Sequence, residues 1–192
     1  MNAAPLVALV GNPNAGKSAL FNALTGARQK VGNYPGVTVE RKVGRLMLDD
    51  GRPIELVDLP GAYSLEPSSP DERVTRDVVT GTQDGERLPD ALVVVVDAAN
   101  LDNHLRFTLQ LIALGLPVVV ALNMVDLAER DGLKLDPEAL ERELGVPVVA
   151  TVAVRRSGLD ALKDRIAEMV KTVTRIRPSP GAALSLHLTR TT

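Results

Sequence analysis

The sequence predicts an α/β protein with a mostly parallel sheet that is covered by helices on both faces. Two segments, Ala91–Val96 and Val118–Leu122, are unbroken apolar runs rich in β-branched residues, which is typical of parallel strands buried on both sides. Helical patterns separate the predicted strands, and such alternation favours a parallel sheet. Ligands of such folds bind beyond the carboxyl ends of the strands, so the residues that follow each strand are the candidates for function.

Composition narrows the class of protein. The 192 residues are 45% hydrophobic and 24% charged, as expected for one main domain with a single good core. A net charge of −2 argues against a broad nucleic-acid surface, so no nucleic-acid partner is expected. The chain has no cysteine, which excludes disulfides and thiolate metal sites. The start MNAAPLVALV lacks a basic segment, and no apolar run approaches a membrane span of about 18 residues, so a soluble chain without a signal peptide is expected.

The first half of the chain begins with a short buried strand at Leu6–Val10. A helix, Lys17–Gly26, opens directly from the loop that follows this strand. Thr38–Leu48 alternates in part, as a half-exposed strand does, and Ile54–Val57 is a second strand. The turn Asp49–Gly51 between them predicts a hairpin.

The second half continues the alternation of strands and helices. Asn103–Leu114 is helical, and the helix Asp136–Leu144 has an N-cap Asp followed by Pro137 in its first position. Val146–Thr151 is predicted as the last strand and Gly158–Val173 as the last helix, with one apolar face. Two histidines are isolated, and His104 is expected on a helix surface.

Some segments show no periodicity. Residues 28–37 and 61–70 flank the motifs described below and are predicted to be mobile switch loops, because loops on a rigid scaffold often carry function.

The main domain is predicted to span residues 1–173. Residues 174–192 are expected to be a disordered tail or the start of a truncated following region.

The loop between the first strand and the first helix matches G-x-x-x-x-G-K-[ST] at every fixed position. Gly11 and Gly16 allow the backbone to turn so that consecutive N–H groups face phosphates, and the helix N-terminus adds a favourable dipole. Lys17 is placed to reach the β- and γ-phosphates, and the Ser18 hydroxyl is placed to ligate Mg²⁺. The remaining predicted contacts of this segment with the nucleotide are Asn12, Pro13, Asn14, Ala15 and Ala19.

A second motif, Asn123-Met124-Val125-Asp126, follows the strand Val118–Leu122 and indicates guanine. The carboxylate of Asp126 can accept hydrogen bonds from guanine N1–H and the 2-amino group, whereas adenine offers neither donor. ATP would therefore leave a buried carboxylate unpaired, at a cost of about 1–3 kcal/mol. Asn123 is expected to tie this segment to the phosphate loop and to face the base, with Met124 beside it.

A third motif closes the strand Ile54–Val57. Asp58 is placed to hold Mg²⁺ through water, and the Gly61 N–H can donate to the γ-phosphate, with Leu59 and Pro60 between them. Thr38 is the best candidate for a second hydroxyl on Mg²⁺ and for a contact with the γ-phosphate. Its neighbours Gly36 and Val37 complete the predicted contacts from this first switch segment.

The motifs GNPNAGKS, NYPGVTVE, DLPGAYSL and NMVD, in this order and spacing, resemble the N-terminal G domain of the FeoB ferrous iron transport proteins over roughly Leu6–Val170. Related GTPases usually have Lys at the position of Met124, and Thr at that of Leu59. The resemblance implies a Ras-like P-loop GTPase fold with a six- to seven-stranded, mostly parallel sheet. It also implies a domain that binds GTP with Mg²⁺ and hydrolyses it slowly to GDP and phosphate.

The resemblance further implies the partners of this domain. In that family the G domain lies at the cytoplasmic face of the bacterial inner membrane, and a helical domain and a membrane pore for Fe²⁺ follow it. This chain would then be a soluble fragment that cannot itself move iron, and any oligomer would form through the full-length protein.

The sequence lacks two of the catalytic groups that many related GTPases use. Many relatives carry Gln directly after the third motif, where this chain has Ala62, which can neither orient water nor accept a proton. No arginine is assigned as a finger, so the intrinsic rate is expected to be slow. In potassium-activated GTPases of this kind, an asparagine at the position of Asn14 coordinates K⁺ where an arginine finger would sit. K⁺ is therefore the expected third cofactor, and the alternative is that Asn14 is an ordinary turn residue.

The loop after the last strand departs from the usual pattern. Relatives commonly have S-A or T-S-A there, whereas this chain has Thr151-Val152-Ala153. Ala153 is still expected to donate its backbone N–H to guanine O6, and the hydroxyl missing at Val152 predicts that the nucleotide binds weakly and exchanges rapidly.

Two other functions stay open. One is a stand-alone ribosome- or tRNA-associated GTPase of the Era or EngA type, which Met124 disfavours. The other is a non-hydrolysing guanine-nucleotide sensor, which Ala62 suggests.

Overall fold

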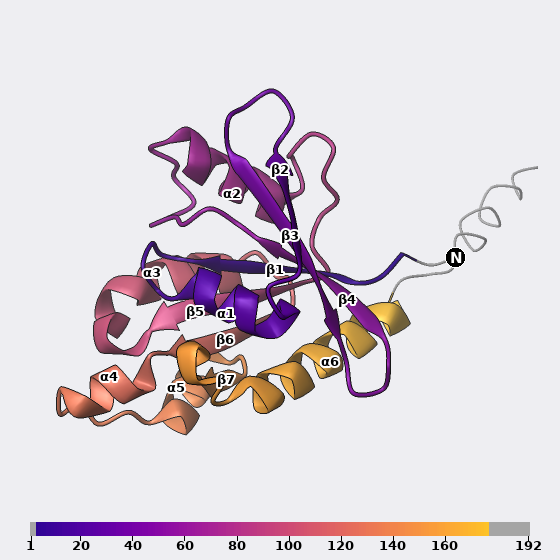
Figure 1. Cartoon of the computed structure of the whole chain (residues 1–192). Helices are drawn as coiled ribbons and strands as arrows, with labels where there is room; N and C mark the ends of the chain where they lie inside the picture. Colours follow the sequence, from indigo (N-terminus) through magenta and orange to yellow (C-terminus); the bar gives the residue numbers. More distant parts are fainter. Residues whose placement is uncertain (1–2, 177–192) are drawn as a thin grey trace, which may run out of the picture.

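The computed structural model describes residues 3–176. Their seven strands form one sheet in the order β2-β3-β4-β1-β5-β6-β7 (Figure 1). The strands β4, β1, β5, β6 and β7 are parallel, and the pairs β2–β3 and β3–β4 are antiparallel. The sheet is therefore mostly parallel, with an antiparallel wing at one edge. The strands are β1 (Leu6–Gly11), β2 (Gln29–Asn33), β3 (Glu40–Met47), β4 (Pro53–Asp58), β5 (Ala91–Asp97), β6 (Val118–Asn123) and β7 (Val148–Ala150).

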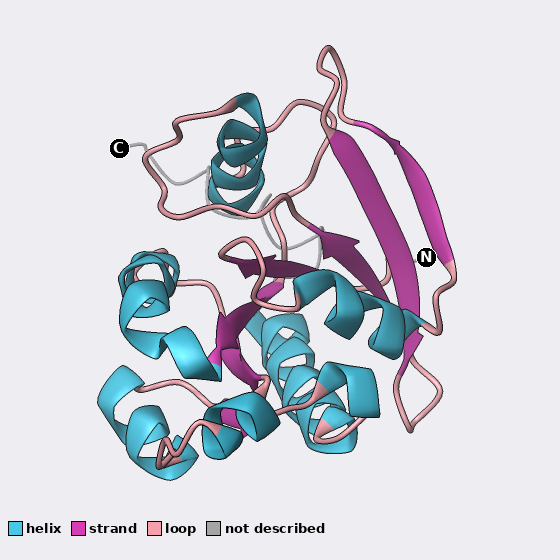
Figure 2. Ribbon diagram, turned by 60° about the vertical axis from the view of Figure 1, so that its left-hand side comes forward, coloured by secondary structure: helices cyan, strands magenta, loops and turns pink. Residues whose placement is uncertain are grey.

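Helices cover both faces of the sheet (Figure 2). Alternate residues of one strand face opposite sides, so Val7 and Leu9 of β1 pack in one apolar cluster, and Ala8 and Val10 pack in the other. The first cluster includes residues of α1 and α6, and the second includes residues of α2, α3 and α4. The helices are α1 (Lys17–Thr25), α2 (Pro70–Thr80), α3 (Leu101–Ile112), α4 (Val125–Arg130), α5 (Pro137–Leu144) and α6 (Leu159–Ile176), with short 3₁₀ turns at Ala98–Asn100 and Ala153–Arg155.

The structure corrects part of the first predicted switch loop. Residues 29–33 are not irregular: they form β2, whose five residues are all exposed and pair with β3 in register Lys30↔Val43. Hydrophobic periodicity could not reveal this strand, because an edge strand with both faces in solvent carries no buried residues.

Two helices were also missing from the expected elements. The helix α2 begins at Pro70, after Ser69, whose side chain accepts a hydrogen bond from Glu72 N at 3.2 Å. The sequence Ser-Pro-Asp-Glu is a capping pattern that could have identified this start. The helix α4 is only six residues long and follows the second motif directly.

The predicted strand Thr38–Leu48 begins only at Glu40, and the predicted strand from Val146 begins at Val148. The helix α6 continues to Ile176, past the predicted boundary at residue 173. The rest of the predicted tail lies outside the described residues. Within residues 3–176, no helix combines the length and the apolar character that crossing a membrane requires.

His104 does not lie on the surface of α3 as expected. Its side chain is buried, and its Nδ1 accepts a hydrogen bond of 3.2 Å from the backbone N–H of Asp97. The imidazole therefore connects α3 to the end of β5. Burial lowers the pKa of His104, and the nearby Asp97 carboxylate opposes that shift.

Candidate nucleotide-binding site

The loop between β1 and α1 has the backbone geometry that a phosphate cradle requires. Gly16 adopts φ +83°, and a side chain there would place Cβ 2.3 Å from Asn123 Nδ2. Asn14 is also left-handed, with φ +66°, a conformation that Asn tolerates better than most residues. The helix α1 begins at Lys17, so its free N-terminal N–H groups lie at the loop.

A cleft of about 460 Å³ lies against this loop. The segment after β4 forms one wall, because Ala62 N donates a hydrogen bond of 3.1 Å to Gly11 O. A Cβ at Gly61 would lie 3.0 Å from the Pro13 ring, so any larger residue would have to displace the loop slightly. The lining residues are Asn12, Pro13, Asn14, Gly16, Lys17, Ser18, Gly61 and Asp71.

Asp58, at the end of β4, connects two residues of the loop. Its carboxylate forms an ion pair with the Lys17 ammonium and accepts a 3.5 Å hydrogen bond from the Ser18 hydroxyl. A buried carboxylate and a hydroxyl on neighbouring elements are hard oxygen donors, which is the chemistry that Mg²⁺ prefers. The two side chains therefore fit a Mg²⁺ ion, which they would hold beside the phosphate loop.

Asn123, at the end of β6, joins three segments of the site through its side-chain amide. Its Nδ2 donates to Ala15 O of the phosphate loop at 3.1 Å. Its Oδ1 accepts from Thr151 Oγ1 at 3.0 Å and from Ala153 N at 3.1 Å. All of these groups are buried, so the amide fixes the phosphate loop relative to the loop after β7.

These bonds bear on two of the predicted contacts. Asn123 lies at the phosphate loop as expected. The N–H of Ala153, predicted to face guanine O6, is donated to Asn123 instead, so that contact with the base stays a prediction. Val152 is buried and also takes part in an antiparallel bridge with Ser157.

Asp126 lies in the first turn of α4, after Met124, which adopts φ +59°. The carboxylate is partly accessible and lies 3.8 Å from the Arg155 guanidinium of the loop after β7. The predicted base-selecting group is thus at the surface of the site, beside a cation that sequence reasoning did not select.

The first switch segment places Thr38 away from the phosphate cleft. Thr38 is exposed and lines a separate concavity with Asn33, Gly36, Val37 and Pro70. Its predicted role at Mg²⁺ therefore requires this segment to move, and it stays a prediction.

Tyr34 is the residue of the first switch segment whose aromatic side chain is buried in the core. The ring is buried in the same apolar cluster as Leu59 and Ala62, and its hydroxyl has no hydrogen-bond partner within the described part of the chain. Burial raises the pKa of the Tyr34 phenol, with the Glu86 carboxylate adding to the effect. Tyr34 of the first switch segment and Ala62 of the second therefore belong to one apolar cluster.

The buried Glu72 side chain forms hydrogen bonds with the second switch segment. Its carboxylate accepts hydrogen bonds from Ser68 N and Ser68 Oγ, both at 2.7 Å, and from Tyr63 N at 3.2 Å. The bonds from Ser68, followed by that from Tyr63, lower the pKa of Glu72. Neither Glu72 nor the cleft-lining Asp71 was among the predicted site residues, although the capping pattern at Ser69 marks their helix.

The comparisons with known proteins agree with this geometry. A family model described as ferrous iron transport protein B matches residues 6–166. The chain belongs to the FeoB family. The Fe(2+) transporter FeoB of Salmonella typhimurium is 48% identical over 161 residues, which cover 82% of this chain and 20% of that protein. The chain thus spans about a fifth of the length of the curated FeoB relatives it matches.

Solved FeoB structures share the fold. A mutant of S. thermophilus NFeoB bound to mGDP is 44% identical, with a TM-score of 0.79, over 86% of this chain and 61% of that chain. The cytosolic domain of T. maritima FeoB in its GMPPNP form is 43% identical, with a TM-score of 0.78, over 85% of this chain and 63% of that chain. These likenesses confirm the predicted P-loop GTPase fold and the FeoB resemblance.

Proposed function

We propose that this chain is the G domain of a ferrous iron transporter, which binds GTP with Mg²⁺ and hydrolyses it slowly to GDP and phosphate. The observation that carries the proposal is the Asn123 amide, which joins the phosphate loop at Ala15 to the loop after β7. Because Asp126 follows Asn123 by three residues, these bonds support a site that combines the phosphate cleft with a carboxylate able to select guanine. FeoB structures solved with GDP bound or in the GMPPNP form support the same nucleotide.

Each residue then has a distinct task in hydrolysis. Lys17 moves its charge from Asp58 to the phosphates, which compensates the negative charge that develops on them. Ser18 and Asp58 hold Mg²⁺, the latter through water, and Thr38 supplies a further hydroxyl when the first switch segment closes. Mg²⁺, when bound, neutralises charge on the phosphate oxygens. The Gly61 N–H donates to the γ-phosphate.

Slow hydrolysis follows from the residues that line the cleft. Lys17 is the only cation among the described residues there, and Arg41, one of the arginines near the switches, is held by Glu86. Ala62 is buried and has no group that could orient a water molecule. We propose that K⁺ supplies the missing positive charge, with Asn14, exposed at the rim of the cleft, as a ligand through its amide oxygen.

The transport role rests on the family. We propose that the domain lies at the cytoplasmic face of the membrane, and that its nucleotide state regulates or drives Fe²⁺ uptake by a helical domain and a pore in the same polypeptide. Replacing Lys17 by Ala in that full-length protein should then abolish GTP-dependent Fe²⁺ uptake by membrane vesicles. Undiminished uptake by this variant would contradict the role of the site in transport.

Steady-state phosphate release tests the enzyme directly. The chain should release phosphate from GTP in KCl, more slowly in NaCl, and not at all from ATP. An Era- or EngA-type ribosome-associated GTPase would instead respond to ribosomal particles, and a non-hydrolysing sensor would bind GTP without releasing phosphate in either salt. Either result would overturn the proposed activity.

A further inference from the structure

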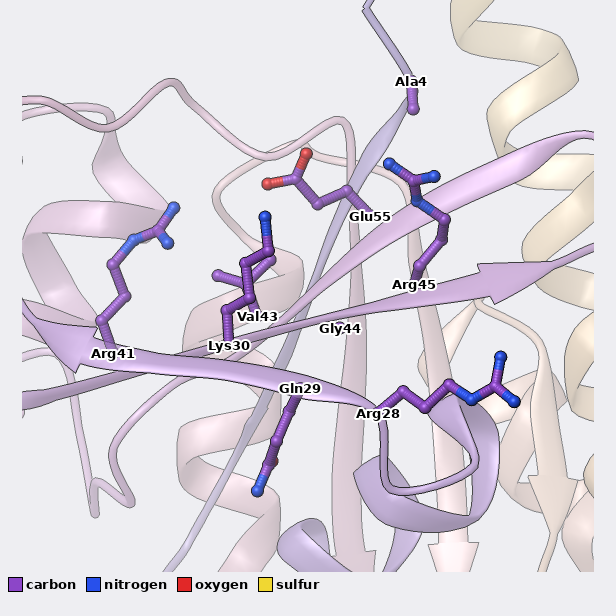
Figure 3. Close-up of a pocket in the computed structure, with 9 residues that line it drawn as sticks. All are labelled: Ala4, Arg28, Gln29, Lys30, Arg41, Val43, Gly44, Arg45 and Glu55. Carbon is purple, nitrogen blue, oxygen red and sulfur yellow. The ribbon is translucent and has the colours of Figure 1, made fainter.

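A concave surface of about 630 Å³ lies on the antiparallel wing of the sheet (Figure 3). Its floor is formed by β2, β3 and β4, and the segment before β1 closes one side at Ala4. We call it the wing groove. It is lined by Ala4, Arg28, Gln29, Lys30, Arg41, Val43, Gly44, Arg45 and Glu55.

The wing groove is separate from the phosphate cleft. The cleft lies beyond Gly11, at the carboxyl end of β1, whereas Ala4 precedes the amino end of the same strand. The two sites share none of their lining residues. Binding in the wing groove would therefore not compete directly with a nucleotide.

Strand register gathers cations on one face of the wing. Lys30 pairs with Val43, and Arg45 pairs with Glu55, so these side chains leave the sheet on the same side. Figure 3 shows Lys30, Arg41 and Arg45 rising from that side with Glu55, while Gln29 points the opposite way. Arg28 directly precedes β2, and in this view its side chain extends away from Lys30 and Glu55.

Most of this positive charge is uncompensated. Arg41 is paired with Glu86, whose two carboxylate oxygens accept bonds of 2.6 and 3.1 Å from Nε and Nη2. Arg28, Lys30 and Arg45 form no ion pair with any residue from 3 to 176. Glu55 is the single acidic residue that lines the groove, so the groove is clearly positive on a chain whose net charge is negative.

We propose that the wing groove is an anion site for a phosphate group carried by a hydroxyl-bearing molecule. Three unpaired cations around one carboxylate match the charge of a phosphate monoester, about −1.5 to −2 at pH 7. The arginine forks bind phosphate oxygens in a bidentate manner, and Lys30 adds a point charge. Glu55 then accepts a hydrogen bond from a hydroxyl of the same ligand.

The shape of the groove favours a compact ligand over an acidic polypeptide. Its volume lies within the range of about 300–1,000 Å³ that is usual for small-molecule sites. A polypeptide rich in carboxylates would bring further negative charge against Glu55 at the floor and Glu86 at the side. A single phosphate with neighbouring hydroxyls avoids that repulsion.

NMR titration with glycerol 3-phosphate tests the proposal residue by residue. The amide resonances of Lys30, Gly44, Arg45 and Glu55 should shift together and saturate, and glycerol alone should leave them unmoved. The substitution Arg45→Glu should weaken binding by roughly tenfold or more, because it removes a charge-assisted hydrogen bond and adds repulsion. Arg142→Glu on α5 is the matched control and should not change the affinity.

Two further probes identify the source of the phosphate. Vesicles of phosphatidylcholine with phosphatidylinositol 4-phosphate, whose headgroup carries a phosphate monoester beside free hydroxyls, should retain the protein and lose it upon Arg45→Glu if a lipid headgroup is the ligand. Hexaglutamate binding more tightly than glycerol 3-phosphate would overturn the proposal in favour of a protein-docking surface. Groove resonances that stay unmoved by both phosphate probes would also overturn it. These readouts do not depend on GTP hydrolysis.

Discussion

The side-chain amide of Asn123 donates a 3.1 Å hydrogen bond to the carbonyl of Ala15, although the two residues lie 108 positions apart in the chain. Through its oxygen the same amide accepts bonds from Thr151 and Ala153. One residue at the end of β6 therefore determines how the phosphate loop and the loop after β7 are placed relative to each other.

Replacing Asn123 by Ala should destabilise the domain and weaken nucleotide binding together. The buried Ala15 carbonyl, Thr151 hydroxyl and Ala153 N–H would lose their partner, and each such loss costs about 1–3 kcal/mol. Urea unfolding and the dissociation constant for GDP measure the two effects. Asn22→Ala, at an exposed position of α1, is the control and should leave both unchanged within error.

Replacing Asp126 by Asn should shift the preference of the site from GTP toward xanthosine triphosphate. The amide can donate to the 2-oxo group of xanthine but cannot accept both guanine donors, and a mismatch of this kind costs at least tenfold in affinity. Competition between the two nucleotides measures the change, with Asp131→Asn as control. GTP affinity that is unaltered in the Asp126 variant would contradict its assignment to the base.

Replacing Asn14 by Ala should remove the stimulation of phosphate release by K⁺ while nucleotide affinity stays close to that of the parent protein. The variant loses the side-chain amide with its oxygen, whereas the backbone N–H groups of the loop remain. Phosphate release in KCl and in NaCl is compared for both proteins. Equal rates in the two salts for the parent protein would remove the basis for a K⁺ site.

The stability of the domain should fall as pH drops through the ordinary His value of 6.5, because burial lowers the pKa of His104 in the folded state. The unfolded chain then binds a proton that the folded chain does not, so the contribution is fully present above 6.5 and is lost below it. Urea unfolding between pH 7.5 and pH 5.5 should show a steeper decline for the parent than for His104→Gln. The depressed pKa of Glu72 affects stability only at lower pH.

Local patterns in the sequence were sufficient for the parallel strands, the phosphate loop and most helices. The runs at Ala91–Val96 and Val118–Leu122 are buried on both faces, so their composition alone identifies them. The edge strand β2 was not predicted, because none of its residues is buried. The helix α4 was not predicted either, because six residues make too few helical turns to show a hydrophobic period.

The sequence by itself therefore determined the fold class, the family and the motif residues that follow β1, β4 and β6, since these depend on residue type and spacing along the chain. Only the tertiary structure decided that Asn123 bonds to Ala15 and that Asp58 contacts both Lys17 and Ser18. It also decided that Lys30 and Arg45 lie on one face of the wing. It also showed that Ala153 donates to Asn123, that Thr38 lies outside the phosphate cleft, and that His104 is buried. The physical reason is that hydrogen bonds and ion pairs act over a few ångströms in space, and the register and crossings of the sheet set those separations.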